Sequence, residues 1–566
     1  MGASSRETIR AAIASHIDLD EVPFTAPGSR LLIRADDQGL SIHEARYEVP
    51  LEESTLLRGL TVRDATGRPQ AWHIPDPARI TWGQDGPTLV ISPQGQVIIG
   101  HLPAHWTVSW VPGPLAPTME MEGAIRLPSR QTVVRTCLPQ ASVRLHSSGS
   151  TGVAHSLDED MAASLRRFDE WMGRCPRVLP EHQDMTWLCW WVLGVNTVHL
   201  EGRGRVVVPS KIGYVGLWQW DAYFIAIGLR HGDVDLAAEQ LRIALGHQLP
   251  NGQLPDVVHE AGVLTSSGDL PESDQETLRA LGTSTDHLGL VPLTKPPLAA
   301  LAVEAVAQAH PGDLVSELSP AIRCCQEWWF SHCDPQGRGV PCYLHPYSSG
   351  LDDSPVFAAG TPLESPDLTA YLSVQDTILA RWARERGHTA AADRHEARSR
   401  ALRDRLARQL DPATGFIPAT GPAGPCAHLT IVSLMPLLVP GLDPALRAGL
   451  LSLLDSAHAF GIRTPVPTVA RTDPAFDAER MWRGPVWVNT NWLVAHGLRT
   501  QGRATRAEAL EAATLKLVIE AGGPAEYFDP LTRRRPPGAT TCFAWSAALF
   551  VDMAVSAAVS ARRRSA

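Results

Sequence analysis

The chain has 566 residues, of which 44% are hydrophobic and 19% are charged, so it is long and apolar enough to build a large core. This composition excludes a wholly disordered protein. The net charge of −10 argues against a nucleic-acid or anionic-membrane partner, because surfaces that bind phosphate groups are usually basic.

The start of the chain, its apolar stretches and its cysteines indicate the cellular compartment. Residues 1–22 lack the apolar run of a signal peptide, and no stretch approaches the roughly 18 uninterrupted apolar residues of a membrane span. The nine cysteines are an odd number without a CxxC pair, which favours free thiols in a reducing cytoplasm. We therefore expect a cytoplasmic protein without a membrane partner. A monomer and a homo-oligomer both remain open.

The first part of the chain has the pattern of β-structure. Short apolar runs alternate with turn sequences such as DDQG, QDGP and SPQG. The clearest runs are RLLIRA at 30–35, TLVISP at 88–93, QVIIGH at 96–101 and TVSWV at 107–111. Their spacing predicts an antiparallel β-sandwich-like domain over residues 1–150. It contains no acid and base in a recognisable setting, so we expect a structural or substrate-limiting role.

From about Ser156 the apolar residues recur at i, i+3, i+4 and i+7, which predicts helices packed on one face. The expected helices lie at 162–172, 186–198, 235–248, 297–309, 316–330, 367–385, 396–410, 429–439, 445–457, 489–501, 506–521 and 543–559. About twelve helices suit a double ring of six inner and six outer members. The sequence therefore predicts a mainly α protein whose residues 151–566 form an (α/α)6 barrel. The loops between these helices are rich in Trp, Pro, Gly, Asp and His, and such loops usually carry function.

Asp221 is the first candidate for an acid. It follows Trp218 and Trp220 and precedes an apolar helix. Desolvation by the indoles would raise the pKa of its carboxyl and keep it protonated, as a general acid requires, whereas the helix dipole would lower that pKa. A plain helix cap among core aromatics is the alternative on local pattern alone.

Glu526 is the candidate for a base. It lies in the loop sequence GGPAEYFDPLT about 300 residues downstream, where a carboxylate can accept a proton from water. Asp529 is a rival in the same loop, and a local Asp-Pro turn is the structural alternative.

Glycoside hydrolysis explains why two carboxyl groups would be needed. One acid protonates the leaving oxygen while a base activates water on the opposite face of the sugar, with about 6.5–9.5 Å between the carboxyls for inversion. The 17 tryptophans outnumber the 11 phenylalanines and the 7 tyrosines, and indole rings suit stacking on sugar faces.

Eight ordered segments resemble glycoside hydrolase family 63, nearest its bacterial mannosylglycerate and glucosylglycerate hydrolases, with family 37 trehalases as more distant relatives. They run from about Ser156 to the end of the chain and are WQWDAYFIAIGL, QLPNGQLPDVV, LTKPPLAALAV, LHPYSSGLDDSPVF, SPDLTAYL, MWRGPVWVNTNWL, AEYFDPLT and FAWSAALFVD. The resemblance implies an (α/α)6 barrel and an inverting mechanism with Asp221 as general acid and Glu526 as general base. It implies no cofactor and no metal.

Other positions follow from the same segments. The resemblance and the local patterns suggest that the sugar subsite includes Trp218, Trp220, Tyr223, Phe224, Gln253, Lys295, His345, Asp352, Asp353, Arg483, Trp487, Asn491 and Trp545. Several of them have a structural alternative. At least two of the aromatics beside the acid are expected in the core, Arg483 is open to a salt bridge, and His345 is open to a satisfied loop histidine.

The chain departs from the family pattern at several positions. Lys295 stands where the family often has Gln, and it is one of only three lysines among fifty basic residues, with Lys211 and Lys516. A carboxylate is lost at Ser348 and one is gained at Asp353, while Arg533-Arg534-Arg535 displaces an expected glycine. These changes leave the acid and base intact and bring glycerate-type specificity into question.

The predicted function is thus an inverting α-glycoside hydrolase that releases a terminal hexose, most simply glucose, from a small carbohydrate. One alternative is an inverting phosphorylase, with Lys295 and residues 533–535 holding phosphate. The other is a non-catalytic carbohydrate-binding barrel. HExxH, phosphate-loop, dinucleotide and GxSxG patterns are absent from the sequence.

Overall fold

The computed structural model describes residues 3–92, 95–115, 118–122, 124–127, 132–136, 141–146, 156–200, 202–461 and 465–565. The chain forms two compact units, Met1–Gly216 and Leu217–Ala566, and each is described by itself. The predicted boundary after residue 150 stays a prediction.

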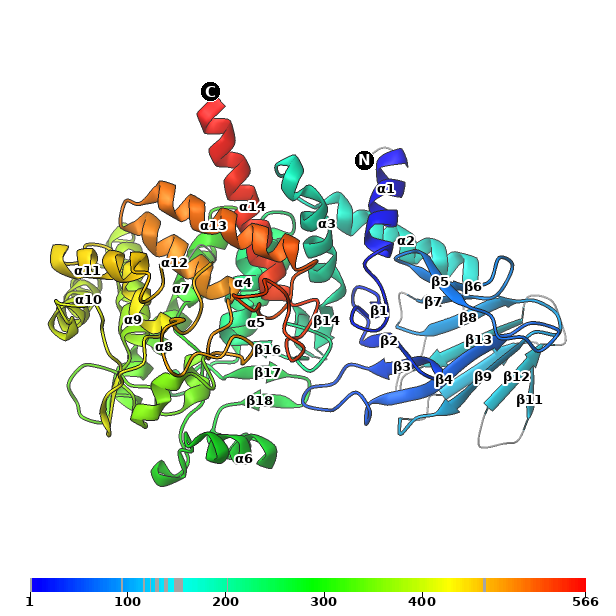
Figure 1. Ribbon diagram of the computed structural model, residues 1–566, viewed down its shortest axis with the longest axis horizontal. Coiled ribbons are helices and arrows are strands. Elements are labelled where there is room, and N and C mark those ends of the chain that lie inside the picture. Colours follow the sequence, from blue (N-terminus) through cyan, green and yellow to red (C-terminus); the bar gives the residue numbers. More distant parts are fainter. Residues whose placement is uncertain are drawn as a thin grey trace. The chain divides into compact units, whose positions relative to one another are not determined.

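The first unit is built around two antiparallel sheets, which Figure 1 shows with the helices of this unit beside them. One sheet has the strand order β1-β2-β3-β4-β9-β12-β11, and the other has the order β10-β13-β8-β7-β6-β5. The strands are β1 (Phe24–Thr25), β2 (Leu31–Asp36), β3 (Gly39–Glu44), β4 (Thr55–Arg63), β5 (Trp72–Asp76), β6 (Arg79–Trp82), β7 (Thr88–Ile91), β8 (Val97–Leu102), β9 (Thr107–Pro112), β10 (Thr118–Glu122), β11 (Ala124–Leu127), β12 (Thr132–Thr136) and β13 (Ala141–His146). The four apolar runs singled out in the sequence form β2, β7, β8 and β9, so the predicted β-sandwich-like domain is confirmed.

Three helices and a hairpin complete this unit. They are α1 (Ala3–Ala14), α2 (Leu157–Gly173), α3 (Pro180–Val195), β14 (Thr197–Leu200) and β15 (Gly204–Val207). α2 packs on β7 and β8, where Leu157 joins a buried cluster with Val90 and Ile98. α2 and α3 are joined by stacked indole rings of Trp171 and Trp190, 4.9 Å apart between centroids.

The second unit is mainly helical. Its helices of at least eight residues are α4 (Gln219–Leu229), α5 (Val234–Gly246), α6 (Glu272–Leu281), α7 (Ala299–Ala307), α8 (Leu314–His332), α9 (Pro366–Glu385), α10 (Thr389–Gln409), the 3-10 helix η5 (Ile431–Leu438), α11 (Pro444–Asp455), α12 (Val488–Thr500), α13 (Ala504–Glu520) and α14 (Ala544–Ser565). The shorter elements are β16 (Leu217–Trp218), β17 (Val257–His259), β18 (Gly262–Leu264), β19 (Thr420–Gly421), β20 (Gly424–Pro425), η1 (Ser267–Asp269), η2 (Asp286–Leu288), η3 (Pro346–Ser349) and η4 (Pro355–Ala359).

The helices of this unit form a ring within an outer layer. α4 contacts α7, α7 contacts α9, α9 contacts η5, η5 contacts α12, α12 contacts α14, and α14 returns to α4. Every residue of α4 and of η5 is buried, as an inner element requires. α5, α8, α10, α11 and α13 pack against this ring from outside. These six inner and five outer helices of the unit have the arrangement of the predicted (α/α)6 barrel.

The structure corrects several expected helices. Residues 429–439 form a 3-10 helix instead of an α-helix, because Pro436 within it cannot donate an α-helical hydrogen bond. The helix expected at 186–198 ends at Val195, and Thr197 and Val198 pair in β14 instead. α6 is additional, since its short polar sequence carries little apolar periodicity.

Two of the three lysines are buried and one is exposed. Lys211 lies in the first unit, where its Nζ donates to Thr25 Oγ1 at 3.0 Å and to the carbonyl of Ala26 at 3.1 Å. Lys516 is a surface residue of α13 whose side chain is 71% exposed. Lys295 lies at the candidate site.

α14 is the one stretch in the described residues that is long and apolar enough to cross a membrane by composition alone. Because 67% of this stretch is buried within the protein and α14 is part of the inner ring, a core helix explains its composition.

Candidate active site

The predicted site residues gather where the inner helices begin. Asp221 is in the first turn of α4, Lys295 lies four residues before α7, Trp487 is the N-cap residue of α12, and Trp545 is the second residue of α14. Glu526 is in the loop between α13 and α14. The ring thus brings residues that are about 300 positions apart in the sequence to one end of the second unit. Figure 1 shows β16, β17 and β18 at that end, where β16 leads into α4.

Asp221 is 5% exposed. Burial raises the pKa of its carboxyl well above the usual range, and the positive charge of Lys295 opposes that rise. The negative charges of Asp256 and Glu526 raise the same pKa further. Burial thus outweighs the charge of Lys295, and the pKa of Asp221 is shifted in the direction that a general acid requires.

Lys295 is the positive centre of a group of carboxyls. Its Nζ lies 3.0 Å from Oδ1 of Asp256 and donates to the carbonyl of Tyr347 at 2.7 Å. Burial alone would lower the pKa of this ammonium, but Asp256, Asp352 and Asp221 together raise it above its usual value. Lys295 thus stays charged beside the candidate acid, where it sets how strongly Asp221 holds its proton.

Replacing Lys295 by Gln should move the pH dependence of turnover. A general acid works only when protonated, so activity falls as pH rises through its pKa. Loss of the ammonium raises the pKa of Asp221, and the basic limb of kcat/KM against pH should move upward by about one unit. Lys295→Arg keeps the charge and should leave the limb in place. An unmoved limb in Lys295→Gln would exclude this electrostatic role.

Asp352 and His345 flank the ammonium from the loop before α9. Burial raises the pKa of Asp352 to about 7, against the opposing charge of Lys295. Burial, together with the positive charge of Lys295, lowers the pKa of His345 to about 3. The Nδ1 atom of His345 accepts a hydrogen bond from the backbone N–H of Tyr347 at 3.1 Å, so the ring proton is assigned to Nε2. His345 is thus a neutral donor rather than a proton carrier.

Four of the predicted site residues carry a buried polar atom without a hydrogen-bond partner among the described residues. These atoms are Nε2 of His345, Oδ1 of Asp352, Nε of Arg483 and Nε1 of Trp545. Buried polar groups in native proteins are nearly always hydrogen-bonded. Three donors and one acceptor of this kind are the groups that hydroxyls of a bound sugar would satisfy.

Aromatic rings form a continuous wall beside Asp221. The indoles of Trp482 and Trp487 stack with their ring centroids 3.7 Å apart. Trp545 meets Trp487 at 5.4 Å and Trp220 at 5.5 Å. Trp220, Trp482, Trp487 and Trp545 are each at most 3% exposed, whereas Trp218 is half-buried. Trp218 is therefore the most accessible of these indoles for stacking on a sugar, and the other four form the buried wall.

Gly350 fixes the position of this wall. Its φ is +69°, and an added Cβ would lie 2.2 Å from Cζ2 of the buried Trp220. Gly350→Ala should lower stability by about 1–3 kcal/mol from overpacking and should reduce kcat by displacing the neighbour of Asp221. Gly282→Ala is a matched control, since Gly282 has the same φ of +69° with nothing within 4 Å. Thermal unfolding with equal losses in both variants would contradict the role of the contact with Trp220.

Three of the predicted subsite residues are held by partners within the protein. The hydroxyl of Tyr223 donates to Gln219 Oε1 at 2.8 Å, while Phe224 is 1% exposed among aromatic rings. Nε2 of Gln253 donates to the carbonyls of Thr265 at 2.7 Å and Leu293 at 2.9 Å. These contacts support a core role for Tyr223 and Phe224, and they occupy the amide donor of Gln253 that was expected at the sugar subsite.

Asn491 and Asp353 brace the segments beside the wall. The amide of Asn491 donates to the carbonyl of Val466 at 2.9 Å and accepts from its N–H at 2.7 Å. Asp353 accepts from the N–H of Trp482 at 2.9 Å and from Nε of Arg480 at 3.1 Å, and it forms a longer ion pair with Nε of Arg483 at 3.7 Å. The carboxylate gained at Asp353 thus positions Arg483 and the aromatic wall.

Glu526 and Asp529 differ in their surroundings. Glu526 is 3% exposed, and its Oε2 accepts the N–H of Thr540 at 3.1 Å. Asp529 accepts the N–H of Leu531 at 2.6 Å and the hydroxyl of Thr532 at 2.7 Å. Asp529 therefore closes a local turn, whereas Glu526 is electrostatically coupled to Asp221.

The arginine run after this loop makes internal contacts. Nε of Arg533 lies 2.5 Å from Oε2 of Glu520 on α13, and Nη1 of Arg535 donates to the carbonyl of Ala539 at 2.8 Å. These arginines anchor the loop that carries Glu526, so their geometry gives no support to a phosphate site.

Asp256 is the clearest residue that the sequence reasoning missed. It is 2% exposed, and burial raises its pKa to about 6 while Lys295 opposes the rise. The sequence offered two hints: an acidic residue three positions after Gln253 in QLPNGQLPDVV, and the unusual Lys295 that needs a negative partner. Within the described residues, no three His, Cys, Asp or Glu side chains are grouped to hold a metal ion.

Comparison with known proteins places this helical unit among glycoside hydrolases. The model of a "Mannosylglycerate hydrolase MGH1-like glycoside hydrolase domain" matches residues 214–546. The mannosylglycerate hydrolase of Thermus thermophilus is 28% identical over 418 residues, which cover 63% of this chain and 98% of that protein. The glucosylglycerate hydrolase of Mycolicibacterium hassiacum is 24% identical over 431 residues, which cover 62% of this chain and 94% of that protein.

A solved structure agrees with these relatives. The crystal structure of the GH63 mannosylglycerate hydrolase from Thermus thermophilus in complex with glucose superposes with a TM-score of 0.54 at 25% sequence identity. The match covers 64% of this chain and 98% of that chain. The predicted (α/α)6 fold and the resemblance to family 63 are confirmed.

Proposed function

Because the chain belongs to the MGH1-like glycoside hydrolases of family 63, we propose that it removes a terminal α-linked hexose from a small glycoside with inversion of configuration. The observation that carries the proposal is the pairing of two buried carboxyls, Asp221 and Glu526. Burial is the main cause that raises the pKa of Asp221 well above its usual range, and the negative charge of Glu526 adds to that rise. Two carboxyls with separated roles are what single-step glycoside hydrolysis requires.

Asp221 is the proposed general acid. Its proton passes to the glycosidic oxygen as the bond to the hexose breaks, which makes the departing alcohol neutral. The raised pKa supports this role, because the acid must be protonated near neutral pH. Lys295 limits that rise, so that Asp221 can still release the proton in the transition state.

Glu526 is the proposed general base. It accepts a proton from a water molecule that attacks the anomeric carbon from the face opposite the leaving group, and one displacement inverts the configuration. The hydrogen bond from Thr540 holds one carboxylate oxygen, Oε2, in place. This contact supports a base of fixed orientation.

Glucose is the hexose we propose, and mannose is the alternative that the names of the relatives bring forward. Half-buried Trp218 offers a stacking face, and Arg483 offers guanidinium donors that Asp353 positions. Lys295 stands where the family often has an amide. Its ammonium is already paired with Asp256, so it is better suited to tuning the acid than to binding a carboxylate of the substrate.

A substrate panel tests this proposal. Glucosylglycerate, mannosylglycerate and α-linked glucose disaccharides should be compared by kcat/KM, each with and without phosphate. We expect free hexose from at least one glucoside and no dependence on phosphate. Sugar phosphate as the product would establish the phosphorylase instead, and absence of turnover on the whole panel would contradict a small α-glycoside as the substrate.

A further inference from the structure

A second candidate site lies away from the predicted active site, between the first half of α8, the end of α9 and the start of α10. The structure has a cavity of about 830 Å³ there, within the ~300–1,000 Å³ typical of small-molecule sites. None of the residues assigned to hydrolysis lines it. The cavity is therefore separate from the proposed acid and base.

The cavity is basic in a protein that is acidic overall. Its lining includes Arg323, Arg386, Arg394, His388 and His395, and no Asp or Glu is among the lining residues. The chain as a whole carries a net charge of −10. A positively charged cavity in a protein of negative net charge attracts anions, so we expect a negatively charged ligand here.

The arginines are available to such a ligand. Arg386 pairs with Asp313 at 3.0 Å, but the side chain of Asp313 is 65% exposed, and exposed pairs are readily replaced. Arg323 and Arg394 are exposed and have no ion pair or hydrogen bond among the residues that the structure describes. Two arginines thus line the cavity without a carboxylate bound to either of them.

The start of α10 adds backbone donors. Its N-cap residue His388 makes no side-chain capping hydrogen bond. The N–H groups of Ala391 and Ala392 bond to the carbonyl of His388, while those of Thr389 and Ala390 have no acceptor in the described parts of the chain. Uncapped N–H groups at a helix start bind phosphate and carboxylate oxygens, aided by the helix dipole.

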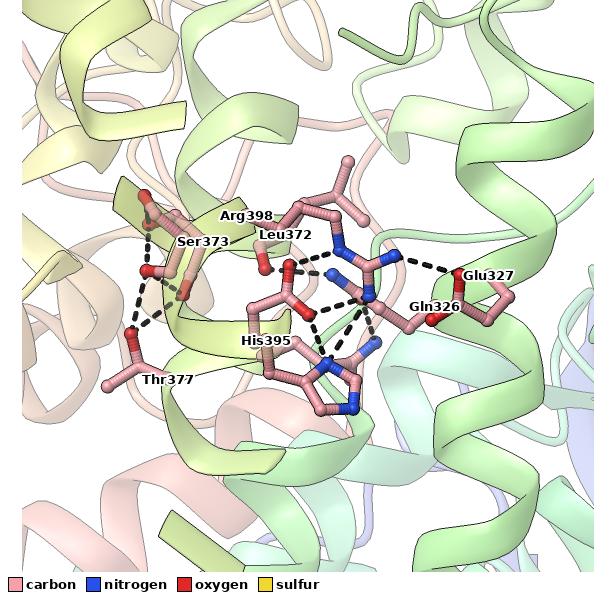
Figure 2. Close-up of polar contacts among 10 residues, drawn as sticks. Gln326, Glu327, Leu372, Ser373, Thr377, His395 and Arg398 are labelled. Atoms are coloured by element: carbon pink, nitrogen blue, oxygen red, sulfur yellow. Dashed lines mark hydrogen bonds and ion pairs between the residues drawn. The ribbon is translucent and has the colours of Figure 1, made fainter. Parts of the chain in front are cut away.

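His395 forms part of the cavity lining, and a carboxylate holds its ring in a fixed orientation. It is 6% exposed, and its Nδ1 lies 2.7 Å from Oδ1 of Asp376. Arg398 holds the same carboxylate through Nε at 2.7 Å and Nη2 at 2.8 Å, and its Nη1 reaches Glu327 at 2.9 Å. Figure 2 shows Arg398 between His395 and Glu327, with the other ring nitrogen of His395 turned away from these contacts. That nitrogen, Nε2, has no partner among the described residues and is left for a ligand.

We propose that this cavity binds a small organic phosphate monoester. The phosphate group would lie at the start of α10 between Arg323 and Arg394, where charge-assisted hydrogen bonds are strongest. Leu379 and Trp382 also line the cavity and give it an apolar wall. This wall favours an organic phosphate over inorganic phosphate, because it can cover the carbon skeleton.

Isothermal titration calorimetry with the full chain tests the proposal. Glucose 6-phosphate is the probe, inorganic phosphate and glucose are the comparisons, and the buffer contains about 50 mM salt to limit screening. We expect glucose 6-phosphate to bind with a Kd below about 1 mM and inorganic phosphate to bind more weakly. No binding of glucose 6-phosphate, or equal binding of inorganic phosphate, would overturn the proposal.

Variants locate the binding. Arg323→Ala with Arg394→Ala should weaken glucose 6-phosphate binding by about tenfold or more, while exposed Arg400→Ala on the same helix should not. Ala390→Asp should also abolish binding, yet thermal unfolding should show α10 intact, because a carboxylate suits the first turn of a helix. Equal losses in Arg400→Ala, or unchanged binding in Ala390→Asp, would show non-specific attraction or binding elsewhere. Any binding of glucose itself should be the same in all these variants.

Discussion

Asp221→Asn should lower kcat on the natural glycoside by about 10²–10⁴-fold, because asparagine cannot protonate the leaving oxygen. The loss should depend on the leaving group. Fluoride departs without protonation, so α-glucosyl fluoride should be hydrolysed by Asp221→Asn with a much smaller loss. A comparison of kcat on the two substrates checks this prediction. Equal losses on both substrates would remove Asp221 from the role of acid.

The same variant should be at least as stable as the natural chain. Folding raises the pKa of Asp221, so the folded state is destabilised as pH rises above the unfolded value of about 3.9. Asparagine removes this cost at neutral pH, and thermal unfolding should show an unchanged or higher Tm. Asp235→Asn is a matched control, since Asp235 is an exposed first-turn aspartate of the next helix. It should leave kcat unchanged.

Glu526→Gln should lower kcat by about 10²–10⁴-fold on both the glycoside and the fluoride, because water must be activated whatever the leaving group. KM should change little, since the amide keeps the shape of the carboxylate and can still accept the hydrogen bond from Thr540. Steady-state kinetics on both substrates separates this pattern from that of Asp221→Asn.

The control for the base lies in the same loop. Asp529→Asn should keep most of the activity, because Asp529 closes a local turn through Leu531 and Thr532 and asparagine retains an acceptor. If Asp529→Asn loses turnover and Glu526→Gln retains it, the base is Asp529. Because the two carboxyls lie three residues apart in one loop, comparing the two variants shows which of them is the base.

Periodicity in the sequence was sufficient for the architecture. Alternating apolar runs predicted β2, β7, β8 and β9, and helical spacing predicted most of the ring, because both patterns record which face of an element is buried. The prediction of an α-helix at residues 429–439 was wrong. Their apolar character indicates burial but does not specify the type of helix, and Pro436 favours the 3-10 form.

The candidate site was only partly predictable. The local sequence pattern could not decide whether Asp221 is a helix cap or a general acid. The pKa of its carboxyl depends on how deeply it is buried, and that depends on what surrounds α4 in three dimensions. The resemblance to family 63 identified Asp221 and Glu526 as a pair, and the comparisons confirm the family. Their catalytic roles remain predictions.

The partner of Lys295 was beyond sequence reasoning. Lys295 was conspicuous as a rare lysine at a position where relatives have an amide, yet Asp256 lies 39 positions earlier, and only the ring joins the two segments. The same applies to Gly350. A side chain at this position would clash with the indole of Trp220, which lies about 130 positions earlier in the chain.

The anomeric configuration of the first-formed hexose tests the central claim most directly. Proton NMR during the first minutes of hydrolysis of an α-glucoside, before mutarotation equilibrates the product, distinguishes the two anomers. Single displacement between Asp221 and Glu526 predicts the β-anomer as the initial product. Initial release of the α-anomer would contradict the inverting mechanism and the roles proposed for both carboxyls.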